Sequence, residues 1–205
     1  MNLGKRASLT SMHQLESESE NKKIKTPSFT CSTLAVANYI IKYMHEKQLS
    51  ISKTKLQNIL VYAHIEYIRK HNKALIAEPV RLTHFGFLFK SVYDLFADLK
   101  YDDNINKQAY ILAETQNNIN ARQYAIDKDI GDALQVLKIK KFLNKILKLF
   151  ADKDIKQAIN INITPGTVWY YIAFVKLQGN HLIKDFIKIS NKSIAKALKY
   201  IKLQA

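Results

Sequence analysis

The sequence predicts a mainly α-helical protein of about six helices, with at most a small β-hairpin or short extended segments, folded as a single compact domain. Two observations carry this prediction. Apolar residues recur at the three- and four-residue spacing of amphipathic helices over most of the chain after residue 28. Alternation typical of strands is limited to one stretch beside Pro79 and one ambiguous stretch over residues 101–126. The 205 residues suffice for one domain with a full core.

The first 28 residues differ in composition from the rest. Ser, Thr, Glu, Lys and Asn dominate residues 1–28, and their few apolar residues follow no sustained period. Such a segment buries too little apolar area to offset the entropy of ordering it. We therefore expect a disordered tail of mixed basic and acidic residues, followed by a helical domain over residues 29–205.

The first half of that domain predicts two helices and an extended piece. One helix is expected from Ser32 or Thr33 to Lys47, where Ser32 can cap free backbone N–H groups, and a second helix is expected to begin near Ser52 or Lys53. Pro79 then breaks the helical pattern. Residues 75–85 predict a short extended segment, and Gly86 allows a tight turn into a helix from Lys90 to Leu99.

The second half predicts mostly helix. A hairpin is predicted over residues 101–126, and a long helix from about Asp129 to Ala151 follows it. The lysines of this helix are expected to face outward. The residues expected to face the core are Ala133, Leu134, Leu137, Phe142, Ile146, Leu149 and Phe150. Thr164 can cap a short helix that has Pro165 in its first position and carries Trp169. A brief helix and a final helix, capped by Ser190 or Asn191, complete the prediction.

The charge of the chain is strongly positive and uneven. Of the net +15, much lies after residue 137, where 14 lysines face only Asp152, Asp154 and Asp185. A basic surface attracts nucleic acid, an anionic membrane or an acidic protein. Abundant Lys, Ile and Asn with only four arginines is also what translation of an AT-rich genome produces. The Lys-rich C-terminal third therefore permits nucleic-acid binding without requiring it.

No catalytic, cofactor or metal motif is found in the sequence. The histidines are not spaced as metal ligands, and no nucleophile elbow or phosphate-binding glycine loop occurs. The single cysteine, Cys31, permits no intramolecular disulfide, which indicates a reducing compartment. No apolar run is long enough to cross a membrane. We expect a non-enzymatic protein of the bacterial cytoplasm, with non-classical export left open.

One reading of the first two helices is a helix-turn-helix. In that arrangement the second helix would enter the major groove of DNA with its first turn. The residues that would face the bases are Lys53, Lys55 and Asn58. A DNA-binding regulator is therefore an alternative function.

The stretch KLQNILVYAHIEYI, followed by an extended piece and then HFGFLFKSVYDLF, resembles the Panacea domain, a family of SocA-like antitoxins and phage-associated GepA-like proteins. Residues matching its two motifs are Lys55, Leu56, Gln57, Leu60, Tyr62, Ala63, Gly86, Val92 and Tyr93. LAVANYIIKYM upstream and ITPGTVWYYIAF downstream also resemble family segments, in the same order. The chain departs from the family at Thr83, where a Trp is usual, at Phe87, where a Pro is usual, and at Asn58, where a Lys is usual.

The resemblance implies a helical protein-binding domain that neutralises a toxin by direct contact, or delivers it to a protease as an adaptor. It implies a contact face around Tyr62, Phe87 and Tyr93. The full set of implied partner-binding residues is Lys55, Gln57, Tyr62, Thr83, Gly86, Phe87, Tyr93 and Trp169. A secreted effector that reuses the same fold is a third possibility.

Overall fold

The computed structural model describes residues 31–84, 86–100, 102–105, 125–178 and 186–204. The predicted polar tail over residues 1–28 and most of the predicted hairpin over residues 101–126 lie outside the described residues. Within them the protein is mainly helical with one small sheet, which confirms the predicted fold class.

Helices and three short strands make up most of the described residues. In chain order they are α2 (Thr33–Glu46), α3 (Lys53–His71), β1 (Val80–Thr83), β2 (Gly86–Leu88), α4 (Lys90–Leu95), α6 (Ile126–Asp129), α7 (Ala133–Phe150), α8 (Ile155–Ile163), α9 (Val168–Tyr170), the π-helix η1 (Tyr171–Lys176), β3 (Ile187–Ile189) and α10 (Asn191–Gln204). Ser32 caps α2 as predicted, by accepting a hydrogen bond from Ala35 N, and Ser52 caps α3 by accepting one from Lys55 N.

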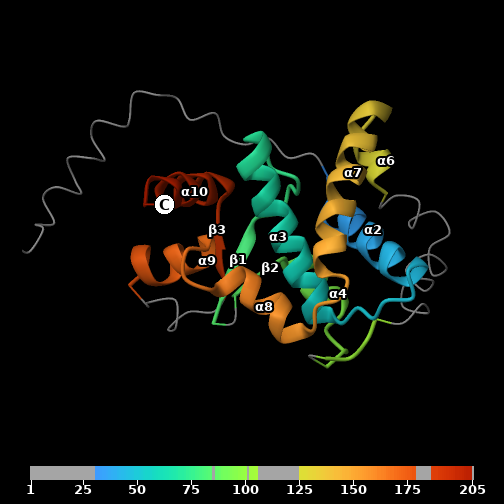
Figure 1. Ribbon diagram of the computed structural model, residues 1–205, viewed down its shortest axis with the longest axis horizontal. Coiled ribbons are helices and arrows are strands. Elements are labelled where there is room, and N and C mark those ends of the chain that lie inside the picture. Colours follow the sequence, from blue (N-terminus) through green and yellow to red (C-terminus); the bar gives the residue numbers. More distant parts are fainter. Residues whose placement is uncertain (1–30, 85, 101, 106–124, 179–185, 205) are drawn as a thin grey trace, which may run out of the picture.

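Helix α3 forms the centre of the molecule. It contacts α2, α4, α7, α8, α10 and β2, and in Figure 1 it runs between the α2 and α7 side and the α9 and α10 side. Its buried apolar residues accordingly extend around more than one face, as Leu56, Ile59, Leu60, Val61, Ala63, Tyr67 and Ile68 show. A helix surrounded in this way positions the other elements.

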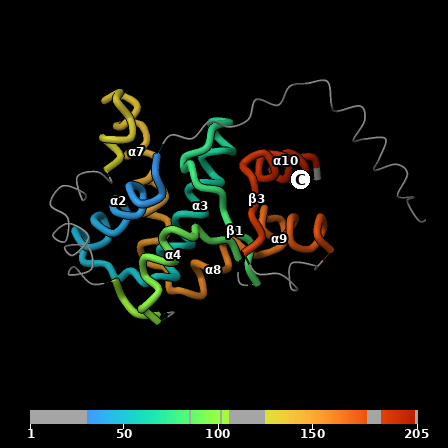
Figure 2. The backbone as a smooth tube through the Cα atoms, turned by 180° about the vertical axis from the view of Figure 1, so that it is seen from behind, coloured from blue at the N-terminus to red at the C-terminus, as the bar shows by residue number. Residues whose placement is uncertain are grey.

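The sheet is antiparallel with the order β2-β1-β3. Thr83 pairs with Gly86 at the hairpin end, and Val80 pairs with Ile189 at the other edge. Figure 2 shows, from behind, β1 and the α4 segment close to α3. Two predictions here were wrong. Gly86 begins a strand before α4, which ends at Leu95 rather than Leu99, and residues 187–189 form a strand rather than the end of a brief helix.

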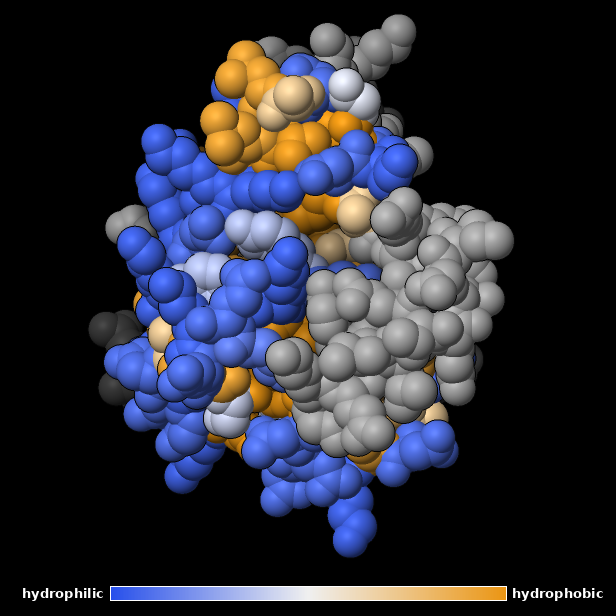
Figure 3. All heavy atoms as spheres, turned by 90° about the vertical axis from the view of Figure 1, so that its right-hand side faces the viewer, coloured by the Kyte–Doolittle hydropathy of each residue, from blue (hydrophilic) through white to orange (hydrophobic). Residues whose placement is uncertain are grey.

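The long helix α7 ends within one residue of its predicted end, but it begins at Ala133, four residues after the predicted start, and α6 (Ile126–Asp129) is a separate helix. The inward face of α7 was also predicted wrongly in part. Leu134 and Leu137 are 59% and 63% exposed, and Ala133 and Leu149 are also exposed. The buried stripe is Val136, Ile139, Phe142, Leu143, Ile146, Leu147 and Phe150. Figure 3 shows hydrophobic side chains at the top of the face where α6 and the first turns of α7 lie, above a hydrophilic belt.

Helix α8 was not predicted, and because of it the helix that carries Trp169 begins at Val168 rather than at Pro165. Asp154 and Gln157 form a reciprocal capping box at its beginning. Thr164 ends α8, because its N–H donates to Asn160 O, so it does not cap the Trp169 helix. Thr167 has that role instead, accepting from Tyr170 N, and Pro165 lies in the intervening turn.

Candidate functional site

One cavity brings together residues that lie far apart in the sequence. It has a volume of about 320 Å³ and lies where α3 begins, beside the hairpin end and α4. Its lining residues are Lys53, Thr54, Gln57, Asn58, Thr83, His84, Phe87, Leu88, Tyr93 and Phe186. We call this cavity the aromatic groove.

Three rings give the aromatic groove its apolar wall. Phe87 is buried, whereas Tyr93 and Phe186 are each 36% exposed. The Tyr93 and Phe186 rings meet edge to face with centroids 5.7 Å apart, a favourable geometry for aromatic pairs. The wall therefore combines a fixed base with two rings that remain accessible.

Phe186 adopts an unusual backbone conformation. Its φ is 59°, in the left-handed region that a bulky residue rarely occupies. Such a conformation costs on the order of 1–3 kcal/mol and persists where the surrounding structure holds it. Here it precedes β3, whose pairing with β1 fixes the chain, and it leaves the ring against Tyr93.

Lys53 holds α4 beside the groove. Its Nζ donates to Phe96 O at 2.9 Å and to Leu99 O at 3.2 Å, so it satisfies carbonyls at and beyond the end of α4. The same ammonium lies 4.8 Å from the centroid of the Tyr93 ring. Lys53 thus fixes both the helix end and the ring.

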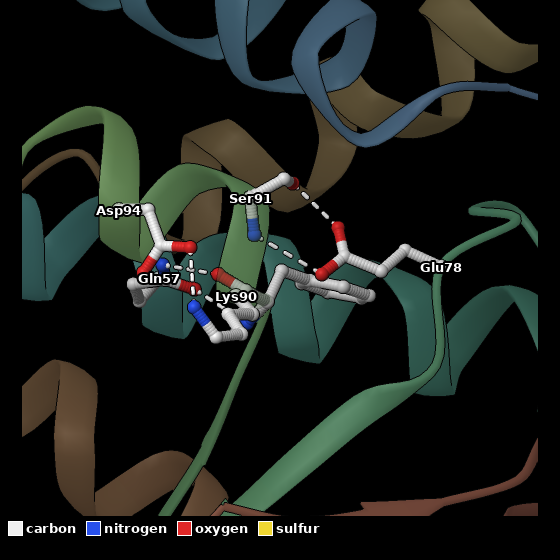
Figure 4. Close-up of polar contacts among 6 residues, drawn as sticks. Gln57, Glu78, Lys90, Ser91 and Asp94 are labelled. Carbon is white, nitrogen blue, oxygen red and sulfur yellow. Dashed lines mark hydrogen bonds and ion pairs between the residues drawn. The ribbon is translucent and has the colours of Figure 1, made fainter.

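Gln57 lines the groove, and its side-chain amide pairs with the backbone of Phe89 through two hydrogen bonds, as a neighbouring strand would. Its Nε2 donates to Phe89 O at 3.0 Å, and Phe89 N donates to its Oε1 at 2.9 Å. Both bonds are buried, and Figure 4 shows the Gln57 amide directed at the start of α4. This reciprocal pair fixes the passage from β2 into α4, so the amide is not free to bind a partner.

Glu78 holds the same segment from the other side. It accepts hydrogen bonds from the backbone N and the hydroxyl of Ser91, in the first turn of α4, and from the hydroxyl of Thr33 in α2. Figure 4 shows its carboxylate facing Ser91. A carboxylate at a helix start is favoured by the helix dipole. Glu78 therefore joins the starts of α2 and α4.

Gly86 and Thr83 shape the hairpin end. Gly86 has φ 130°, which side chains strongly disfavour, and a Cβ there would lie 3.5 Å from Ile163 Cγ2 of α8. The Thr83 hydroxyl donates to Gly86 O at 3.0 Å. The glycine is required by its backbone conformation, and the threonine closes the turn.

The structure brings some predicted partner-binding residues together and separates others. Gln57, Thr83, Phe87 and Tyr93 line the aromatic groove, with Gly86 in the same hairpin. The predicted common face with Tyr62 is not formed around this groove. Tyr62 packs edge to face on Phe150 of α7, 5.4 Å between centroids, and burial raises the pKa of its hydroxyl.

Trp169 and Lys55 also lie away from the groove. Trp169 is buried and packs against Phe174 of η1, with centroids 5.5 Å apart. Lys55 lines a separate cavity beside α8. Neither adds to the aromatic groove as a contact residue.

The three residues of the helix-turn-helix alternative are engaged inside the protein. Lys53 binds the end of α4 as described above. Asn58 donates to Thr54 O at 3.0 Å and accepts from Asn162 Nδ2 of α8 at 3.0 Å. Lys55 is only 6% exposed. A recognition helix must present such side chains to the groove of DNA, and α3 does not present these.

Sequence reasoning missed four lining residues of the groove, Thr54, His84, Leu88 and Phe186. Phe186 gave no signal, because its place depends on the pairing of β3 with β1. His84 ends the alternating stretch and could have been assigned to the hairpin tip, where it is exposed. Leu88 is a strand residue with its side chain at the cavity.

No family model, curated protein or solved structure matches the chain. Among the described residues, no group of three or more His, Cys, Asp or Glu side chains could hold a metal ion. None of the described helices is both long and apolar enough for a membrane span.

Proposed function

We propose that the protein is a non-enzymatic binding module that captures a protein partner through the aromatic groove. One observation carries this proposal: three stretches far apart in the sequence, residues 53–58, residues 83–93 and Phe186, converge on the cavity and leave Tyr93 and Phe186 accessible at its wall. Lys53, Gln57 and Glu78 fix the surrounding backbone through the bonds described above. A pre-formed site loses little entropy on binding.

The chemistry of the groove suits an apolar or aromatic side chain of a partner. Aromatic anchors inserted into packed pockets dominate the energy of protein interfaces. Phe87 and Leu88 provide the apolar base, and Asn58 and His84 provide polar groups at its lining. Polar groups at the edge of an apolar pocket orient a ligand more than they add affinity.

The class of partner follows from the sequence resemblance. Panacea-like motifs at Lys55–Leu56–Gln57 and at Gly86 and Tyr93 favour an antitoxin, which neutralises a toxin by contact or delivers it to a protease. In this proposal the protein acts in the bacterial cytoplasm. A secreted effector would use the same groove on another partner.

Co-expression with the adjacent open reading frame tests the antitoxin role. If that frame encodes a growth inhibitor, wild-type protein restores growth and the Tyr93→Ala variant fails to. Tyr200→Ala is a matched control, because Tyr200 has the same 36% exposure and lies on α10. Absence of a growth inhibitor there, or equal rescue by both variants, would contradict the proposal.

Nucleic-acid binding is a second candidate, supported by lysines of the C-terminal third. Among the described residues, no ion pair involves the lysines of α10 or these lysines of α7: Lys138, Lys141, Lys145 and Lys148. A gel-shift titration at two salt concentrations tests it. Sequence-independent affinity that falls steeply with salt would indicate binding by charge alone.

A further inference from the structure

A second cavity lies at the start of α8 and, like the aromatic groove, is lined by residues from the start of α3. It has a volume of about 380 Å³. Its lining residues are Ser50, Ser52, Lys55, Asn104, Lys153, Asp154, Ile155 and Lys156. Three lysines from two helices and the turn between α7 and α8 thus meet one aspartate in a single hollow.

Lys55 is the unusual member of this cavity. It is only 6% exposed, and among the described residues its ammonium has one hydrogen-bond acceptor, Ala151 O, at the long distance of 3.5 Å. No described carboxylate lies within 4.0 Å of it. A buried charge without a close counterion is expensive, because burial removes its hydration. Burial accordingly lowers the pKa of Lys55, which Asp152 and Asp154 partly oppose.

The rest of the cavity adds positive potential. Lys153 and Lys156 line it, and Lys153 has only a long contact of 3.7 Å to Asp152. The helices α3 and α8 both begin here, so the positive ends of their dipoles add to the lysines. Asp154 opposes them with one negative charge, and its carboxylate caps α8 by accepting a hydrogen bond from Gln157 N at 2.7 Å.

We propose that this cavity binds a small phosphate-bearing anion, either inorganic phosphate or a low-molecular-weight phosphomonoester. The ligand would accept hydrogen bonds from Lys55 at the base and from Lys156 at the mouth. A doubly charged group with several acceptor oxygens matches three ammonium groups and the hydroxyl of Ser50 better than a singly charged carboxylate does. The Ser52 hydroxyl already accepts from Lys55 N at 3.1 Å and holds the start of α3 in place.

Titration of the full chain with inorganic phosphate and with glycerol 3-phosphate, each against chloride at equal ionic strength, tests the proposal by thermal shift and calorimetry. Both phosphate compounds should bind and stabilise the wild type, whereas chloride should not. A phosphomonoester source would show as tighter binding of glycerol 3-phosphate than of phosphate. Lys55→Met should weaken binding roughly tenfold or more, because it removes a charged hydrogen bond.

Two further variants distinguish binding in this cavity from non-specific attraction of anions to the positively charged protein. Lys156→Met changes an exposed residue and should weaken binding several-fold without affecting the fold. Lys199→Met removes the same charge from α10 and should leave affinity unchanged. If Lys55→Met does not fold, as circular dichroism would show, Lys156→Met decides. Equal affinity in wild type and Lys156→Met, equal losses in Lys156→Met and Lys199→Met, or equal stabilisation by chloride would overturn the proposal.

Discussion

His64 shows how one buried side chain joins distant parts of the fold. Its Nδ1 accepts a hydrogen bond from Ile76 N at 3.2 Å, so its Nε2 carries the proton and donates to Asn191 Oδ1 at 2.8 Å. The neutral ring therefore links α3 to the chain before β1 and to the start of α10. Burial lowers the pKa of His64 to about 4.

This pKa predicts a pH-dependent stability. The unfolded state binds a proton near pH 6.5, whereas the folded state does so only near pH 4, so the folded state loses stability as the pH falls between these values. The full loss is on the order of 3 kcal/mol. Urea unfolding of wild type and His64→Gln across this range measures it.

The His64→Gln variant should be less stable at pH 7, and the difference from wild type should shrink as the pH falls toward 4. The His84→Gln variant is the control, because it shows how the free energy of unfolding changes when an exposed imidazole is lost. A difference between wild type and His64→Gln that stays constant with pH would show that His64 does not titrate as described.

Gln57 leads to a second prediction at this scale. Gln57→Leu would leave the buried N–H and C=O of Phe89 without their partners and should lower the free energy of unfolding by about 2–4 kcal/mol. Gln157→Ala removes a side chain from an exposed capping box and should cost about 1 kcal/mol or less. Urea denaturation distinguishes the two. If Gln57→Leu lowered the free energy of unfolding no more than Gln157→Ala does, the two hydrogen bonds between Gln57 and Phe89 would not stabilise the fold as described.

The predictable residues were those that act locally. Ser32 caps the helix that begins immediately after it, and the sequence alone predicted this cap as well as the start of the next helix near Ser52 or Lys53. The family resemblance led to the prediction that Gln57 contacts a partner. Its bond to Phe89 spans 32 positions, so no local pattern in the sequence revealed that its amide is engaged inside the protein. Buried polar groups find distant partners that periodicity does not reveal.

At the scale of the element, α7 shows how a helix can be predicted while its inward face is not. The stripe Val136, Ile139, Leu143, Ile146 and Phe150 follows alternating steps of three and four and faces the core. Leu134 and Leu137 instead belong to the stripe of exposed lysines. Their apolar character suggested burial, but helical geometry places them outside.

Substitutions in α7 test this register. Leu137→Lys should change the free energy of unfolding by less than about 0.5 kcal/mol, because its side chain is exposed. Ile139→Ala, two positions away, should cost about 2–5 kcal/mol, because it leaves a cavity in the core. Chemical denaturation of both variants measures the contrast. Similar costs at the two positions would refute the register.

The two missed elements differ in whether the sequence could have shown them. The start of α8 has an Asp154 cap and Gln157 three residues later, a readable signal. The strand β3 has only three residues and exists through its pairing with β1, more than a hundred positions earlier. Short strands of this kind are defined by tertiary contacts.

At the scale of the whole molecule, ion pairs occur in the first half of the chain, whereas the lysines of α10 have none among the described residues. Glu66 pairs with Arg69 and Lys70 on α3, and Asp94 pairs with Lys90 on α4. The described lysines of α10 have no acidic partner among the described residues. The predicted Lys-rich C-terminal third therefore presents lysines that attract anions at long range.

The candidate site was predictable in part from the sequence. The order of motifs in the sequence pointed to Gln57, Thr83, Phe87 and Tyr93, which the fold brings to one cavity. Tyr62 and Trp169 matched family motifs as well, yet both pack into the core or against neighbouring helices. A motif indicates which residues matter to a fold more readily than which of them face a partner.

The central claim is that Tyr93 at the aromatic groove contacts a protein partner. Calorimetric titration of the purified chain with the product of the adjacent open reading frame tests it most directly, using wild type, Tyr93→Ala and Tyr200→Ala. We expect Tyr93→Ala to weaken binding by roughly 30-fold or more, the effect of losing an aromatic anchor, and Tyr200→Ala to bind as wild type does. Equal affinity of all three proteins, or no binding by the wild type, would contradict it.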